Sequence, residues 1–153
     1  MLKCAYSSPL FLYKKGERIK MLEVYSVSQT FSDGVAIPLN NISISKGCTA
    51  VLAAPATIEL NKCGVYMVSC NSTLTGAAAG SARIQMSKNG VAQPQAQAGE
   101  TLAVTPTSLD FTTLVQVNQN NNTCYCTSPT LLQFIYSGDD ATGTINVCVT
   151  KIC

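Results

Sequence analysis

The stretch "CGVYMVSCNSTLTG", residues 63–76, predicts a β-strand with apolar side chains on both of its faces. Successive side chains of a strand point to opposite sides, so residues two apart share a face. Four of them share the first face: Tyr66, Val68, Cys70 and Leu74. Val65 and Met67 lie on the second face. We expect one face to pack on the opposite sheet of a sandwich and the other on a neighbouring subunit, and residue parity leaves open which is which.

The rest of the chain predicts an all-β fold, because Gly, Pro, Asn and Thr recur between short apolar runs and no long helical period is present. "KNG" at 88–90 is typical of a two-residue hairpin turn. "SGDDATG" at 137–143 predicts the loop of the last hairpin, and "NQNNNTCYC" at 118–126 a polar connection. The ten predicted strands are 23–31, 42–45, 49–53, 56–60, 64–74, 81–88, 100–105, 108–117, 130–137 and 143–152. This number of short strands suits a sandwich.

The composition points to subunit contacts. Of the 153 residues, 12% are charged and 46% are hydrophobic, whereas about 25% are charged in an ordinary soluble domain. This number of charged residues is too small to cover the surface of a fully solvated monomer. The net charge of +2 argues against a nucleic-acid partner, which calls for a strongly basic surface, and no apolar run approaches the ~20 residues of a membrane span.

The positive charge is concentrated in the first residues. Residues 1–20 contain five basic residues and one acid, a net charge of +4, and residues 21–153 contain five basic and seven acidic residues. We therefore divide the chain into an N-terminal arm, 1–22, that docks on a larger partner, and a trimerisation domain, 23–153. An apolar patch followed by basic residues carries the docking: Leu10, Phe11, Leu12, Tyr13, Lys14, Lys15, Arg18 and Lys20. A terminal hairpin around Lys15 and Gly16 is the alternative.

The eight cysteines are interpreted as reduced thiols. The basic residues follow the apolar stretch "PLFLY" instead of preceding it, so no export signal is recognisable and we expect folding in a reducing cytoplasm without disulfides. Cys70 and Cys148 have the position of small apolar fillers in a core. Four thiols could together bind a zinc ion: Cys124, Cys126, Cys148 and Cys153. Only one residue separates Cys124 from Cys126, however, and paired zinc ligands need a longer spacing.

The sequence argues against an enzyme. It contains no histidine, which excludes Ser-His-Asp and Cys-His nucleophile systems and the commonest metal ligand. Asp139 and Asp140 could bind calcium or act as a carboxylate pair, but adjacent acids beside glycine are typical of a solvated turn. We expect no catalytic residue, no cofactor and no metal.

Several motifs together carry a family resemblance. The opening stretch with "ARIQMSKNGV" resembles the Gly-x-Tyr strand and following hairpin of the tumour necrosis factor and complement-C1q-like trimeric jelly rolls. The wider frame resembles bacteriophage members of that superfamily, through "GVAIPL", "APATIEL", "FTTLVQV" and the terminal "TINVCVTKIC". The resemblance covers residues 24–153. It implies a jelly-roll sandwich in which three subunits pack around a threefold axis through one sheet of each.

The resemblance also implies a function. Phage members are small virion components, so we expect a homotrimeric capsid decoration or head-fibre protein on the virion surface, assembled in the host cytoplasm. Its partner would be the major capsid protein or another virion component. The alternative is the receptor-binding tip of a tail fibre or baseplate, with a host surface polysaccharide as ligand. A head domain of a collagen-like spore-coat protein is a third interpretation, weakened because the chain has no Gly-X-Y repeat.

Overall fold

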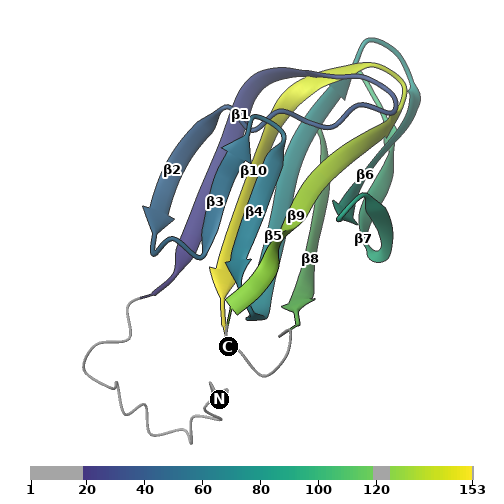
Figure 1. Cartoon of the computed structure of the whole chain (residues 1–153). Helices are drawn as coiled ribbons and strands as arrows, with labels where there is room; N and C mark the ends of the chain where they lie inside the picture. Colours follow the sequence, from purple (N-terminus) through teal and green to yellow (C-terminus); the bar gives the residue numbers. More distant parts are fainter. Residues whose placement is uncertain (1–18, 119–124, 153) are drawn as a thin grey trace, which may run out of the picture.

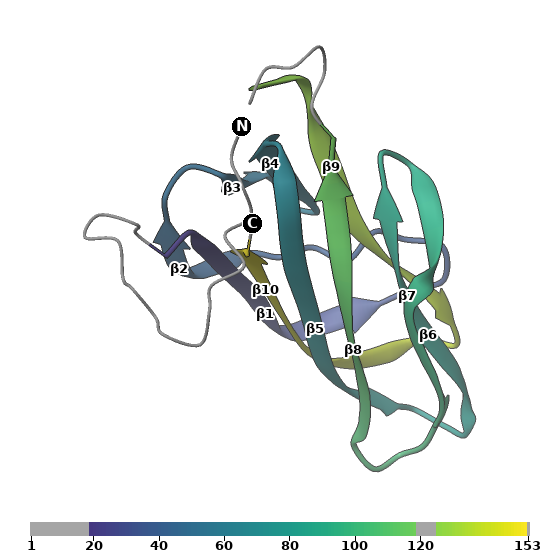
Figure 2. The same ribbon diagram turned by 90° about the horizontal axis from the view of Figure 1, so that it is seen from below.

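The structure, a computed structural model, describes residues 19–118 and 125–152, with only the backbone for 125–128. These residues form ten strands in two five-stranded antiparallel sheets that pack face to face (Figures 1 and 2). Sheet I has the order β2 (Asn41–Lys46), β1 (Met21–Phe31), β10 (Ala141–Lys151), β5 (Gly64–Gly76) and β8 (Thr107–Val117). Sheet II has the order β3 (Ala50–Ala54), β4 (Thr57–Lys62), β9 (Tyr125–Gly138), β6 (Gly80–Lys88) and β7 (Val91–Leu102).

The predicted all-β sandwich of ten strands is confirmed. The described residues contain no helix, and hence none with the length and apolarity to cross a membrane. β1 begins at Met21, so the last two residues of the predicted arm belong to a strand. Ile19 and Lys20 precede β1, and residues 1–18 of the arm lie outside the described residues.

The largest error in the predicted strands concerns β7. It runs over Val91–Leu102 and pairs with β6, whereas the sequence predicted a strand at 100–105. Residues 91–99, "VAQPQAQAG", are poor in β-branched side chains and contain Pro94, which argued against a strand. β7 is an edge strand of sheet II, where a proline can occupy a position that needs no N–H donor.

The predicted last hairpin is also wrong. β9 and β10 are connected by a short turn, but β9 pairs with β4 and β6 in sheet II, and β10 pairs with β1 and β5 in sheet I. The turn at residues 139–140 is therefore a crossover between the two sheets. Local sequence gives the turn but not the sheet to which each flanking strand belongs.

The Asn-Gly hairpin between β6 and β7 is confirmed. Asn89 and Gly90 have φ angles of 51° and 80°, as a type I′ turn requires. The Asn89 backbone N–H donates to the Leu131 carbonyl (2.8 Å), and its side-chain oxygen accepts from the Leu131 N–H (2.8 Å). These two bonds attach the turn to β9.

The core lies between the two sheets. β5 contributes Tyr66, Val68, Cys70 and Leu74, all fully buried, and β9 contributes Leu132, Phe134 and Tyr136 from the other side. The Phe31 and Tyr136 rings lie 5.6 Å apart, a distance typical of tilted aromatic pairs. The face of β5 that begins with Tyr66 is thus the one covered by sheet II.

Candidate interaction surfaces

The outward face of sheet I carries the side chains that the sandwich does not cover. Met67 is 40% exposed and its cross-strand neighbour Leu114 is 59% exposed. Thr150 pairs with Met67 on the other side, and Met21 pairs with Thr150. We call these four residues, which follow one another across β1, β10, β5 and β8, the apolar row. Val65, half-buried, lies next to it on β5.

This geometry divides the opening stretch between two surfaces. Tyr66 and Val68 are core residues, and the Tyr66 hydroxyl donates to the Lys62 carbonyl (2.7 Å). Val65 and Met67 point outward from sheet I. They are therefore the residues of the stretch that can meet a second subunit, and the contact itself stays a prediction.

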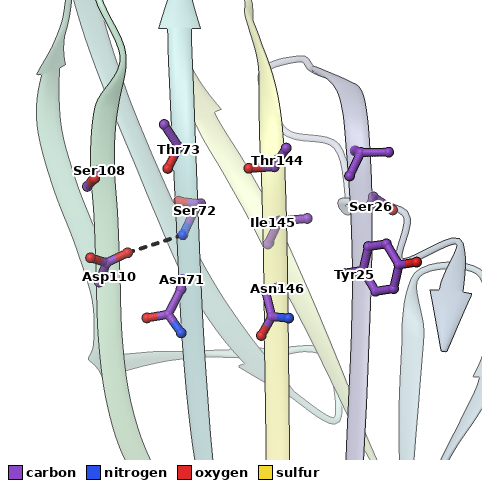
Figure 3. A pocket seen from close by; sticks show the side chains of 11 residues that line it. Tyr25, Ser26, Asn71, Ser72, Thr73, Ser108, Asp110, Thr144, Ile145 and Asn146 are labelled. Carbon is purple, nitrogen blue, oxygen red and sulfur yellow. Dashed lines mark hydrogen bonds between the residues drawn. The ribbon is translucent and has the colours of Figure 1, made fainter. Parts of the chain in front are cut away.

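A polar row crosses the same face nearer to the other end of the strands. The register places one outward residue from each strand of sheet I side by side: Asn41, Tyr25, Asn146, Asn71 and Asp110. We call these five residues the polar row. Figure 3 shows four of them beside Thr73, Ser108 and Thr144 around a shallow depression of about 540 Å³. Amide, hydroxyl and carboxylate groups line it, so it can both donate and accept hydrogen bonds.

One carboxylate, that of Asp110, lines this depression, and a second, that of Glu23, is hydrogen-bonded to its lining residue Asn146. Asp110 accepts a hydrogen bond from the Ser72 backbone N–H (3.2 Å), drawn as a dashed line in Figure 3. Glu23 accepts from the Asn146 amide (2.9 Å) and from the Ser43 hydroxyl (3.0 Å). Among the residues that the structure describes, no lysine or arginine lines the depression. The arrangement suits a neutral, hydroxyl-rich ligand better than an anion.

The acids of the β9–β10 turn have structural partners. The Asp139 carboxylate accepts from the Ser81 N–H (2.8 Å), and Asp33 accepts from the Gly138 N–H (2.9 Å). The Tyr136 hydroxyl donates to the Asp139 carbonyl. Burial raises the pKa of Tyr136, and the negative charges of Asp139, Asp140 and Asp33 raise it further. Among the described residues, no three cysteines or acids are grouped closely enough to bind a metal.

The cysteines have different surroundings. Cys70 is fully buried, and burial, with a smaller contribution from the Asp110 charge, raises the pKa of its thiol to about 12. Cys48 is exposed. Cys148 was predicted to fill the core, but it is half-buried on the outward face of sheet I, since it pairs with Glu23 and Ser69 there. The side chains of Cys124, Cys126 and Cys153 lie outside the described residues, so the four-thiol cluster is not tested.

Of the eight docking residues predicted in the arm, only Lys20 falls within the described chain. Its carbonyl accepts a hydrogen bond from the Lys151 N–H (3.1 Å), which ties the start of β1 to the end of β10. Its side chain lies against Gly47, where a Cβ would come within 2.9 Å of the Lys20 Cγ. Leu10, Phe11, Leu12, Tyr13, Lys14, Lys15 and Arg18 lie outside the described residues, and their docking role stays a prediction.

Sequence reasoning did not find the two rows. Their members come from β1, β2, β5, β8 and β10, strands that are distant in sequence, and the register of the sheet brings them together. Alternation within one strand identifies which side chains share a face. It does not identify which residue of the next strand stands opposite.

Three solved structures are similar to this chain in fold. Murine APRIL at pH 5.0 has a TM-score of 0.57 and 9% identity, over 87% of this chain and 99% of that one. The globular domain of zebrafish complement 1qA protein has a TM-score of 0.54 and 9% identity, over 84% and 94%. PRD1 vertex protein P5 has a TM-score of 0.50 and 12% identity, over 90% and 100%.

The similarity concerns the fold, because the identities are low. A scan of protein-family profiles found no match, and a search of curated proteins found none. The structural match extends over most of this chain, which forms two five-stranded sheets. The chain therefore has a jelly-roll fold of the tumour necrosis factor/C1q type.

Proposed function

We propose that this chain is a homotrimeric structural protein of a bacteriophage virion, a capsid decoration or head-fibre protein fastened to the particle through its N-terminal arm. Domains of the tumour necrosis factor/C1q type typically form homotrimers and are typically not enzymes. One protein of similar fold is a viral vertex protein, which supports a role in a virion.

The observation that carries the proposal is the apolar row. Met67 and Leu114 are adjacent on β5 and β8, and both are exposed to solvent in the single chain. Side chains of this size that touch on the flat face of a sheet are typical of a surface that a partner covers. A second copy packed on sheet I would bury them, and three copies would close around an axis.

Localisation on assembled particles tests the virion role. Particles purified from the source of this protein are labelled with an antibody against the described domain and viewed by electron microscopy. The proposal expects label on the head, repeated with the symmetry of the shell. Particles that carry no label anywhere would overturn it.

The polar row favours a second function, the tip of a tail fibre or baseplate that binds a host surface polysaccharide. Asn and Asp side chains beside Tyr25 match the hydroxyls and the apolar ring faces of a sugar. The double variant Asn71→Ala, Asn146→Ala removes two amides from the depression. This function expects label at the tail and a loss of binding to purified host polysaccharide in that variant, whereas head labelling with no binding would exclude it.

A further inference from the structure

Four of the five lysines among the described residues lie at one end of the sandwich. Lys20 immediately precedes β1, and Lys46, Lys62 and Lys151 are the last residues of β2, β4 and β10. In Figures 1 and 2 the start of β1 and the ends of these three strands lie at the same end of the molecule. Met21 pairs with Lys46, and the Lys151 N–H donates to the Lys20 carbonyl (3.1 Å). We call this end, with its four lysines, the basic end.

The opposite end carries acids. Asp33 follows β1, and Asp139 and Asp140 form the β9–β10 turn. The hydrogen bond from the Gly138 N–H to Asp33 (2.9 Å) brings these segments together. Arg83 and Glu100 lie on neighbouring strands near this end, where Ala82 pairs with Glu100 and Gly138. These acids are separated from the four lysines of the basic end along the length of the domain, although Arg83 lies among them.

The acids nearest to the basic end do not cancel it. Glu23 lies two residues after Met21 on the same outward face of β1. It is hydrogen-bonded to Asn146 and Ser43 on the face of sheet I. Glu59 lies inside β4, opposite Val51 and Leu131, and not at the strand end. The basic end therefore keeps an excess of positive charge.

The arm adds to this excess. It joins the domain at Lys20, and its sequence contributes Lys14, Lys15 and Arg18. Attractive charges on the domain and on the arm that leaves it would act on the same partner surface, because they share one end of the molecule. Over distances of a Debye length, about 8 Å at physiological salt, such charges act together.

We infer that the basic end is itself a docking surface, which seats the domain on an acidic protein surface and points the acidic end away from it. The inference rests on the proposed function and adds the orientation of the trimer. The arm supplies apolar anchors, and the lysines of the domain guide the approach and fix the tilt. In a trimer the charges act in triplicate, so weak contacts are strengthened by their high effective concentration.

A charge-matched pair of full-length variants tests the inference. Lys46→Gln, Lys62→Gln lowers the charge of the basic end by two units, and Arg83→Glu lowers the charge of β6 near the acidic end by the same amount. Both variants keep the whole arm. A third, Lys14→Ser, Lys15→Ser, Arg18→Ser, reduces the charge of the arm alone. Their association with virus particles that lack the protein is followed over a range of ionic strength, and light scattering and circular dichroism verify assembly and folding.

We expect the Lys46, Lys62 variant to associate about tenfold more slowly than the unmodified protein at low ionic strength, with the difference lost at high salt. The Arg83→Glu control should stay within about twofold of the unmodified protein. Electron microscopy of decorated particles should place the Asp139–Asp140 turn farthest from the shell.

Three results would overturn the inference. If only the arm variant is slowed, the arm docks alone, and the proposed function stands. If duplex DNA or phosphatidylserine vesicles bind the unmodified protein as tightly as particles do, and this binding is lost in the Lys46, Lys62 variant, the basic end serves another class of partner. If the unmodified protein does not bind particles at all, the proposed function fails as well.

Discussion

The two faces of sheet I are built from the same strands but have different tasks. On β5, Tyr66 is fully buried against sheet II, and Met67, the next residue, is 40% exposed on the other side. The inward face is mostly apolar, with Ser26, Ser72 and Thr113 as its buried polar residues. The outward face changes from the apolar row near the arm to the polar row beyond it. The inward face thus stabilises one subunit, and the pattern of the outward face is specific to this protein.

The largest effect should come from the inward face. Tyr66→Ala removes a fully buried ring and the hydroxyl that donates to the Lys62 carbonyl. Truncation of a buried aromatic side chain costs about 3–5 kcal/mol, so the free energy of unfolding measured in urea should fall by that amount. Met67→Ala is the matched control on the outward face. An equal loss in both variants would mean that the two faces do not differ.

A charge on the apolar row should separate subunits without unfolding them. In Leu114→Asp an unpaired carboxylate would be buried at each contact, at a cost of several kcal/mol. We expect a folded monomer, seen as native circular dichroism together with a lower mass in light scattering. Val104→Asp provides the control, because Val104 is 67% exposed and lies outside sheet I. Dissociation by the control variant alone would place the contact elsewhere.

The pH dependence of stability should report the buried thiol of the inward face. The pKa of Cys70 is raised from its ordinary value of 9.0 to about 12 by burial, so the unfolded chain releases this proton at a lower pH than the folded one. The contribution of the protonated Cys70 thiol to the free energy of unfolding is therefore complete below pH 9 and is lost progressively as the pH rises from 9 toward 12. Denaturant titrations should show a shallower decline in Cys70→Ala. The pKa of Tyr136 is also raised, so its hydroxyl makes stability fall with rising pH in the same direction. This contribution is still present in Cys70→Ala. An unchanged slope in the variant would show that Cys70 does not contribute.

The smallest effect concerns a turn that belongs to neither face. Gly90 has φ of 80°, and a Cβ added there would meet no atom within 4 Å. Gly90→Ala should therefore cost only the backbone strain of a left-handed residue, about 1 kcal/mol. Thermal unfolding should show a small decrease with the trimer retained. A loss of the trimer would mean that this hairpin takes part in the subunit contact.

The alternation of apolar and polar side chains, together with turn residues and glycines, was enough to predict the bounds of nine strands within a few residues. β7 was displaced because Pro94 and the alternating Ala and Gln residues have little intrinsic strand preference, and pairing with β6 overrides it. The β9–β10 crossover was mistaken for a hairpin because a short turn between two strands looks the same in sequence in both cases. In each error, the deciding information was the identity of the partner strand.

The candidate surfaces needed the same information. Residues 65–68 have apolar side chains on both faces of the strand, and only the position of sheet II shows that Tyr66 faces the core and Met67 faces outward. The basic end could in principle have been predicted from the sequence, since Lys46, Lys62 and Lys151 each end a strand. Relating them required the direction of every strand. The polar row required the register of four strand pairs, which alternation does not contain.

The mass of the unmodified protein in solution tests the role of the outward face most directly. Sedimentation equilibrium or light scattering at micromolar concentration should give three times the 16.2 kDa of one chain. Met67 should then become protected from mild oxidation compared with Met67 in the Leu114→Asp monomer, because its partner subunit covers it. A stable, soluble monomer with an accessible Met67 would contradict the account.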